Sequence, residues 1–201
     1  MSTLNATEKL YDKDAYTRLF TGRVLSYVQT SDDTADVVLD RTAFFPEEGG
    51  QCCDRGTLAG RTVTHVSLCR GVITHTLSLG GTCHPALAPG EEVTGEIDDT
   101  VRRRNMQVHT GEHILSGTLY RLYGFANVGF HLGADEVTAD FDGTLTPAQW
   151  DEVEETVNRI IRENHPVKAY YPTEEQRLAT FYRAKREVEG PLRLVQIGEN
   201  G

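Results

Sequence analysis

Residues 102–117 read RRRNMQVHTGEHILSG, and this stretch predicts the central helix of the chain. Apolar residues recur on both sides of it at spacings near three and four, which is the period of an α-helix. Asp98 or Asp99 stands where an N-cap is expected. We expect the helix to run from Asp99 to about Leu122 and to end at Gly124, because glycine suits a left-handed C-cap.

Two histidines, His109 and His113, stand one helical turn apart in this stretch, so their side chains share a face. Two imidazoles in this arrangement can bind one metal ion, and zinc is commonly bound from a helix in this way. Two ligands do not make a complete site, and two histidines side by side on a polar helix face fit the bare pattern equally well. The pattern therefore gives a candidate zinc site whose other ligands are open.

Composition narrows the class of protein. The chain has 201 residues, 38% of them hydrophobic, with a formal net charge of −10 and a pI near 5.1. Such an acidic chain is not expected to bind DNA through broad phosphate neutralisation. No apolar run approaches the ~20 residues that span a bilayer, and residues 1–14 are too polar for a secretory signal. We expect a cytoplasmic protein with no membrane or DNA partner.

Four cysteines lie in the first half of the chain, and two of them are the adjacent Cys52 and Cys53. Their spacing is not that of a disulfide framework in a small secreted protein, so we expect reduced thiols.

The first half of the sequence is built from short strand-like segments separated by glycine- and proline-containing turns, and it shows no helical period before Asp98. This pattern is typical of an antiparallel barrel or sandwich. We predict a small antiparallel β-barrel domain over residues 1–97. Its expected strands are residues 21–29, 35–40, 56–58, 62–68, 71–77 and 92–97.

The second half changes to an α+β pattern, and we predict a two-layer α+β domain over residues 98–201 with helices packed on an antiparallel sheet. Residues 127–132 and 136–141 are expected to form a hairpin. Thr146, Pro147 and Gln149 predict the start of a second helix, because they fit an N-cap, a first helical position and a capping box.

One further segment, residues 41–56, contains an adjacent glycine pair, Gly49 and Gly50, followed by Gln51. Two glycines permit positive φ angles and a close approach of another backbone or a ligand. The amide of Gln51 can donate and accept hydrogen bonds. On chemistry alone a barrel turn is the simpler interpretation.

This segment, TAFFPEEGGQCCDRG from Thr42 to Gly56, resembles the glycine-rich "T-x-F-Y/F-P-x-x-G-G-Q-x-x-D-x-G" motif of alanyl-tRNA editing proteins. That family comprises the free-standing AlaX type and the editing domain of alanyl-tRNA synthetase. Arg103, Met106 and the HTGEH sequence at residues 109–113 resemble the family's zinc-binding helix. The two motifs occur in the family's order, and the resemblance extends from about Val24 to the end of the chain.

The resemblance implies a trans-editing hydrolase that deacylates tRNA(Ala) mischarged with serine, or with glycine, and that uses zinc. Zinc would be bound by His109 and His113. By position in the motifs, Thr42 and Gln51 are expected to recognise the serine hydroxyl or to line its pocket, and His131 to act as a general base or hydrogen-bonding group. The expected site residues are His109, His113 and His131 for catalysis, and Thr42, Gly49, Gly50, Gln51, Arg102 and Arg103 for binding of the charged tRNA.

The chain departs from the family pattern near its end. Family members supply further zinc ligands from a Cys-x-x-x-His segment after the strand expected at residues 192–197, and the sequence stops at Gly201 before any such segment. We therefore expect a chain that is shortened at its C-terminal end and whose zinc site is incomplete.

Two other functions remain open. The first is a non-catalytic tRNA-binding or regulatory module that lacks two zinc ligands. The second is a metallopeptidase, because residues 109–113 also fit the HxxEH pattern with Glu112 as general base. The peptidase interpretation leaves the glycine-rich segment unexplained.

Overall fold

The computed structural model describes residues 6–81, 85–133, 136–179 and 192–198, so Cys83 lies outside the described residues. The chain divides into two compact units, which are Met1–Gln107 with Leu132–Glu136, and Val108–His131 with Val137–Gly201. The predicted domain boundary after Ile97 remains a prediction. None of the helices in the described ranges is both long enough and apolar enough to cross a membrane.

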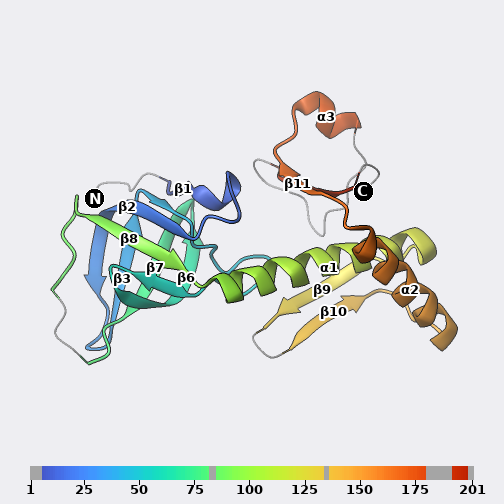
Figure 1. Ribbon diagram of the computed structural model, residues 1–201, viewed down its shortest axis with the longest axis horizontal. Coiled ribbons are helices and arrows are strands. Elements are labelled where there is room, and N and C mark those ends of the chain that lie inside the picture. Colours follow the sequence, from blue (N-terminus) through green and yellow to red (C-terminus); the bar gives the residue numbers. More distant parts are fainter. Residues whose placement is uncertain (1–5, 82–84, 134–135, 180–191, 199–201) are drawn as a thin grey trace. The chain divides into compact units, whose positions relative to one another are not determined.

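Six strands of the first unit pair in the order β2-β3-β7-β6-β5-β8, and β8 pairs with β2, so that the ring closes into a barrel (Figure 1). All six pairings are antiparallel. The register shifts between Val24 and Ser26 and between Val63 and His65, as β-bulges do where a small barrel curves. The strands are β2 Leu19–Gln29, β3 Thr34–Leu39, β5 Gly56–Leu58, β6 Arg61–Cys69, β7 Val72–Ser78 and β8 Glu92–Ile97.

The barrel interior is filled by alternate residues of these strands, since successive side chains point to opposite faces of a sheet. Along β7 and β8 every second residue is buried. Phe20 packs over Gly95 of the neighbouring strand, and a Cβ at that glycine would clash with the ring. A short parallel pairing of β1 (Glu8–Lys9) with β4 (Arg41–Thr42) and a 3-10 turn, η1 (Leu10–Asp12), complete the unit.

The predicted central helix is confirmed as α1, Asp99–Tyr123. Asp98 is its N-cap, because its Oδ1 accepts hydrogen bonds from the backbone N–H groups of Thr100 and Val101. Gly124 follows the helix with a φ of 74°, the left-handed conformation expected of the C-cap.

The second unit contains helices and short strands, which confirms the α+β class. The predicted cap of α2 is confirmed: Thr146 accepts a hydrogen bond from the backbone N–H of Gln149, whose side chain completes the capping box. The described elements are β9 Asn127–Leu132, β10 Val137–Phe141, α2 Pro147–Glu163, β11 Val167–Tyr170, α3 Glu174–Ala179 and β12 Leu194–Ile197.

The sheet of the second unit differs from the prediction. One antiparallel sheet was expected, but within the described ranges β9 pairs with β10 and β11 pairs with β12 as two separate two-stranded sheets. Val167 lies opposite Ile197, and Tyr170 lies opposite Leu194. A strand-like sequence identifies residues that prefer an extended backbone. It does not identify the strands with which they pair, so the number of sheets could not be predicted from the pattern.

Candidate functional site

Helix α1 brings the two predicted metal ligands together. The imidazole rings of His109 and His113 are stacked, with centroids 4.8 Å apart and an interplanar angle of 23°. Phe130 of β9 lies 5.7 Å from His109, centroid to centroid. The i, i+4 spacing that suggested a shared face therefore produces two neighbouring imidazoles in the folded unit.

Glu112 joins the histidine pair. One ligand atom from each of His109, Glu112 and His113 lies within 4.8 Å of the others, and no other such group of three occurs in the described ranges. Sequence reasoning gave Glu112 a role only in the peptidase alternative. Its i+3 spacing from His109 is the signal that places it on the same helix face.

Two polar side chains that the sequence analysis did not single out lie against Glu112. Ser116 donates a hydrogen bond to its Oε1, and Asn127, at the start of β9, donates a second to the same oxygen. Glu112 and Ser116 are buried. The i, i+4 spacing of Glu112 and Ser116 indicates their contact. Asn127 belongs to another element, and no sequence pattern predicts that it contacts Glu112.

His131 does not belong to this group in the part of the chain that the structure describes. It lies in β9 with its side chain exposed, while His109, Glu112 and His113 converge without it. Its role as general base remains a prediction that the geometry of the group does not support.

The glycine-rich segment forms a tight turn in the barrel unit. Gly49 and Gly50 have φ angles of 63° and 85°, which glycine adopts without strain. Glu48 and Gln51 form a two-residue bridge, and the backbone N–H of Leu132 donates to the carbonyl of Gly50 at 2.7 Å. Gln51 is buried, whereas both glycines are exposed. The turn therefore offers bare backbone to a ligand at the glycine pair.

Thr42 is placed differently from the expected role. Its side chain is fully buried, and its Oγ1 lies 2.8 Å from Nε2 of His75. Nδ1 of His75 must donate to the carbonyl of Val37, so Nε2 of the neutral ring is an acceptor and the Thr42 hydroxyl donates to it. Burial lowers the pKa of His75 to about 4, which keeps the ring neutral. The hydroxyl of Thr42 is its only side-chain donor, and it donates inside the barrel. It is therefore not available to recognise the hydroxyl of a seryl group.

Arg102 is also placed differently. Its guanidinium is buried and bonds Asp54, with the shortest N–O distance at 2.5 Å, and it donates to the carbonyls of Ala15 and Ala43. Asp54 in turn accepts a hydrogen bond from the backbone N–H of Phe45. The polar groups of this buried Arg102–Asp54 ion pair are hydrogen-bonded, and the pair connects the start of α1 to the barrel. The expected phosphate contact of Arg102 is therefore replaced by a structural role.

Arg103, one residue further on, points outward. Its Nε donates to Asp99 at 2.7 Å, and its guanidinium lies 5.9 Å from the centre of the Tyr16 ring. The side chain is half exposed, so it can reach a phosphate by exchanging a solvated partner. Its predicted contact with tRNA is compatible with this placement.

The described cysteines, Cys52, Cys53 and Cys69, are free thiols, as predicted for these three. Burial raises the pKa of Cys53, so the thiolate that a metal or a nucleophilic reaction needs is disfavoured there. Its sulfur lies 3.7 Å from Nδ1 of His65.

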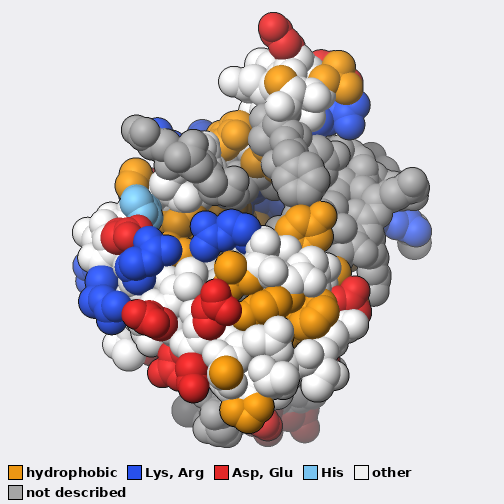
Figure 2. Space-filling view, turned by 90° about the vertical axis from the view of Figure 1, so that its right-hand side faces the viewer, with side chains coloured by type: hydrophobic (Ala, Val, Ile, Leu, Met, Phe, Trp, Pro, Cys, Tyr) orange, Lys and Arg blue, Asp and Glu red, His pale blue; other side chains and the backbone are white. Residues whose placement is uncertain are grey.

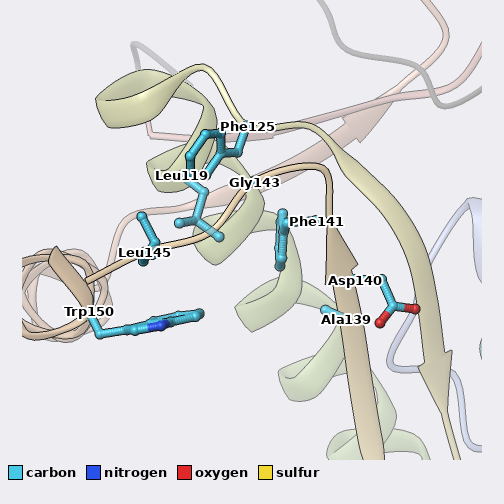
Figure 3. Close-up of a pocket in the computed structure, with 8 residues that line it drawn as sticks. All are labelled: Leu119, Phe125, Ala139, Asp140, Phe141, Gly143, Leu145 and Trp150. Atoms are coloured by element: carbon cyan, nitrogen blue, oxygen red, sulfur yellow. The ribbon is translucent and has the colours of Figure 1, made fainter. Parts of the chain in front are cut away.

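A hollow of about 220 Å³ lies in the second unit (Figure 3). Trp150 of α2 and Leu145, which precedes that helix, face it. The carboxylate of Asp140 points toward β9, where it lies against Gly129. The hollow is smaller than the ~300–1,000 Å³ typical of small-molecule sites, and its facing side chains are mainly apolar. It does not resemble a site for a charged tRNA end.

Comparison with known proteins identifies relatives over both units. Residues 3–101 match the family model of class II (A) tRNA synthetases. The alanyl-tRNA editing protein AlaX-M of Methanosarcina acetivorans is 34% identical over 95% of this chain and 82% of its own length. AlaX-L of Pyrococcus horikoshii is 34% identical over 96% of this chain and 48% of its own length. An alanine–tRNA ligase of Natronomonas pharaonis is 31% identical over the whole chain and 22% of the ligase. The chain therefore belongs to the alanyl-tRNA editing protein family of the AlaX type.

Proposed function

We propose that the chain is an aminoacyl-tRNA deacylase that acts in trans on tRNA(Ala) carrying serine, with glycine as a second wrong amino acid, in the cytoplasm. Family membership supports the class of reaction. The observation that carries the proposal is the convergence of His109, Glu112 and His113 on α1. It brings two imidazoles and a carboxylate together in a chain of this family.

The need for this reaction follows from the energetics of recognition. Glycine lacks one methyl group of alanine, and serine adds one hydroxyl. A binding pocket for alanine discriminates against such neighbours only by on the order of 10²-fold. A second site of different shape must remove the errors, and the ester bond it cleaves is already activated. The enzyme mainly has to position the ester, a water molecule and the tRNA end.

The donor set of the site fits zinc. Imidazole is a ligand type that zinc commonly takes, and the spacing of the pair allows His109 and His113 to contribute one nitrogen each. When bound, zinc supplies Lewis-acid polarisation of an ester carbonyl or of water. The ring of Phe130 lies beside that of His109.

We assign tRNA binding to a small number of basic side chains, because the chain is acidic overall. Arg103 is our candidate for a phosphate contact, and it fixes position rather than base identity. Gly49 and Gly50 are our candidates for a close approach of the aminoacyl group, since both are exposed and carry no side chain.

The direct test measures release of the amino acid from seryl-, glycyl- and alanyl-tRNA(Ala) by the full chain supplied with Zn²⁺. We expect the seryl ester to be cleaved well above buffer hydrolysis and the alanyl ester to be largely spared. His109→Ala should remove the activity, and His165→Ala, an exposed histidine of the same unit, should not.

Two outcomes would replace the proposal. Binding of tRNA(Ala) without hydrolysis of any of the three esters would identify a non-catalytic module. Cleavage of peptides together with intact seryl esters would identify a zinc peptidase.

A further inference from the structure

Beside the histidine pair lies a buried carboxylate that needs an explanation. Glu112 is 8% exposed, although it stands on the same helix face as two partly exposed histidines. Burying a carboxylate is costly unless hydrogen bonds replace its water. The residues that supply those hydrogen bonds therefore indicate the role of the carboxylate.

The hydrogens around Oε1 of Glu112 can be assigned one by one. The hydroxyl of Ser116 donates to this oxygen, because a carboxylate can only accept. The Nδ2 group of Asn127 donates one hydrogen to the same oxygen and the other to Oγ of Ser116, at 3.1 Å. The reverse orientation of the amide would set its Oδ1 against the carboxylate. The three side chains form a closed triangle in which every hydrogen is used.

The second oxygen of Glu112 faces the histidine pair. Oε2 lies 3.4 Å from Nδ1 of His113, within reach of a hydrogen bond after a small adjustment. Histidines that bind metals usually donate their other ring N–H to a carboxylate, which fixes the tautomer and the orientation of the ring. With Nδ1 turned toward Glu112, Nε2 would be the nitrogen that holds a metal ion.

We propose that Glu112 is a positioning residue for His113, and that Ser116 and Asn127 hold it in place. Oε1 accepts hydrogen bonds from Ser116 and Asn127, and Oε2 lies 3.4 Å from Nδ1 of His113, so in this proposal Glu112 acts through the imidazole and not as a metal ligand. The inference rests on the proposed function only for the identity of the metal bound by His109 and His113. It also gives Asn127, on a different element, a place in the site.

The test compares Glu112→Gln, Ser116→Ala and Asn127→Ala in the full chain. In Glu112→Gln the new amide oxygen can still accept from Ser116 and Asn127, while the amide nitrogen faces Nδ1 of His113 with a donor instead of an acceptor. The control is Glu155→Gln, the same chemical change at an exposed position of the second unit.

The first readout is Zn²⁺ affinity by competition with a chromophoric chelator. We expect Glu112→Gln to weaken binding about 10–100-fold, the usual effect of losing a group that supports a ligand. Ser116→Ala and Asn127→Ala should weaken it by smaller factors in the same direction, and Glu155→Gln should not change it.

The second readout is the visible absorption of the Co²⁺-loaded protein. A positioning role leaves the ligand set intact, so the Glu112→Gln variant loaded with excess Co²⁺ should keep the wild-type band positions. Shifted bands would make Glu112 a ligand and overturn the proposal. Lower unfolding stability with unchanged Zn²⁺ affinity would make its role purely structural and would also overturn it, as would failure of the wild type to bind either metal.

These outcomes separate the inference from the proposed function. Wild-type hydrolysis of seryl-tRNA(Ala) with a metal affinity unaffected by Glu112→Gln would leave the function and remove the inference. Metal binding that depends on Glu112, in a protein that cleaves no ester, would do the opposite.

Discussion

The two units of the chain bury their apolar residues to different degrees. Among the residues that the structure describes, the buried members of the hydrophobic core cluster all lie between Tyr11 and Ile97, in the barrel unit. The buried hydrophobic residues that the structure describes in the second unit are Leu119, Val153 and Leu194. That unit instead carries most of the exposed large hydrophobic side chains, which are Tyr120, Val128, Val137, Trp150, Ile161, Val167, Tyr171, Leu178 and Val195.

On the face shown in Figure 2, hydrophobic side chains gather in small groups among charged ones. Burial of apolar area is the main favourable contribution to folding. We infer that the barrel is the more stable scaffold and that the candidate metal ligands lie in the less stable unit. Functional elements are often drawn from the less stable parts of a protein.

The largest effect is expected from the buried ion pair of the barrel unit. Arg102→Ala leaves the Asp54 carboxylate buried without its cation, which should cost about 3–5 kcal/mol of unfolding free energy. The measurement is urea unfolding at constant slope. Arg103→Ala is the matched control and should leave the midpoint unchanged, because its pair with Asp99 is exposed. Equal midpoints for the two variants would refute the structural role of Arg102.

A leucine series compares the units directly. Leu77→Ala, in the barrel, should cost about 2–5 kcal/mol, since the side chain is fully buried. Leu119→Ala, in the second unit, should fall near the lower end of that range, because Leu119 already borders the hollow of Figure 3. Leu178→Ala, 76% exposed, should stay within about 0.5 kcal/mol of wild type. Equal costs for Leu77 and Leu119 would remove the contrast between the units.

The buried hydrogen bond of Thr42 gives a smaller effect. Thr42→Val keeps the shape of the side chain but leaves Nε2 of His75 without a donor, and this should cost about 1–3 kcal/mol. Thr42→Ser, which retains a hydroxyl, should recover part of the loss. An altered ratio of seryl to alanyl cleavage at unchanged stability would return Thr42 to substrate recognition.

His75 should also make stability depend on pH. Its pKa falls from 6.5 to about 4 on folding because the ring is buried, so the unfolded chain binds more protons between these values. The contribution is fully present above pH 6.5 and is lost as the pH falls toward 4, with a slope that approaches about 1.4 kcal/mol per pH unit. His75→Gln should flatten this part of the profile, which urea unfolding at a series of pH values measures.

The smallest effect concerns tRNA. Arg103→Ala should reduce the slope of log affinity against log salt by about one unit if its guanidinium contacts a phosphate. Filter binding over a range of salt concentrations measures this slope. An unchanged slope would make Arg103 part of the solvated surface of α1.

The comparison also shows what sequence patterns predict well. The bounds of α1, the cap of α2 and most barrel strands follow from local periodicity and capping residues, so they were close to the structure. The roles of Arg102 and Thr42 were not, because a partner such as Asp54 or His75 is distant in sequence. Spacing along a helix found His109 and His113, but Asn127 joins their surroundings only through the packing of β9.

Trp150 is the only tryptophan of the chain and lies half exposed at the hollow of the second unit. Its fluorescence therefore reports on that unit alone, while circular dichroism of the strands is dominated by the barrel. In a denaturant titration followed by both signals, coincident curves would mean that the chain unfolds as one cooperative system. An earlier fluorescence transition would show that the helix face with the candidate metal ligands can be lost while the barrel remains folded.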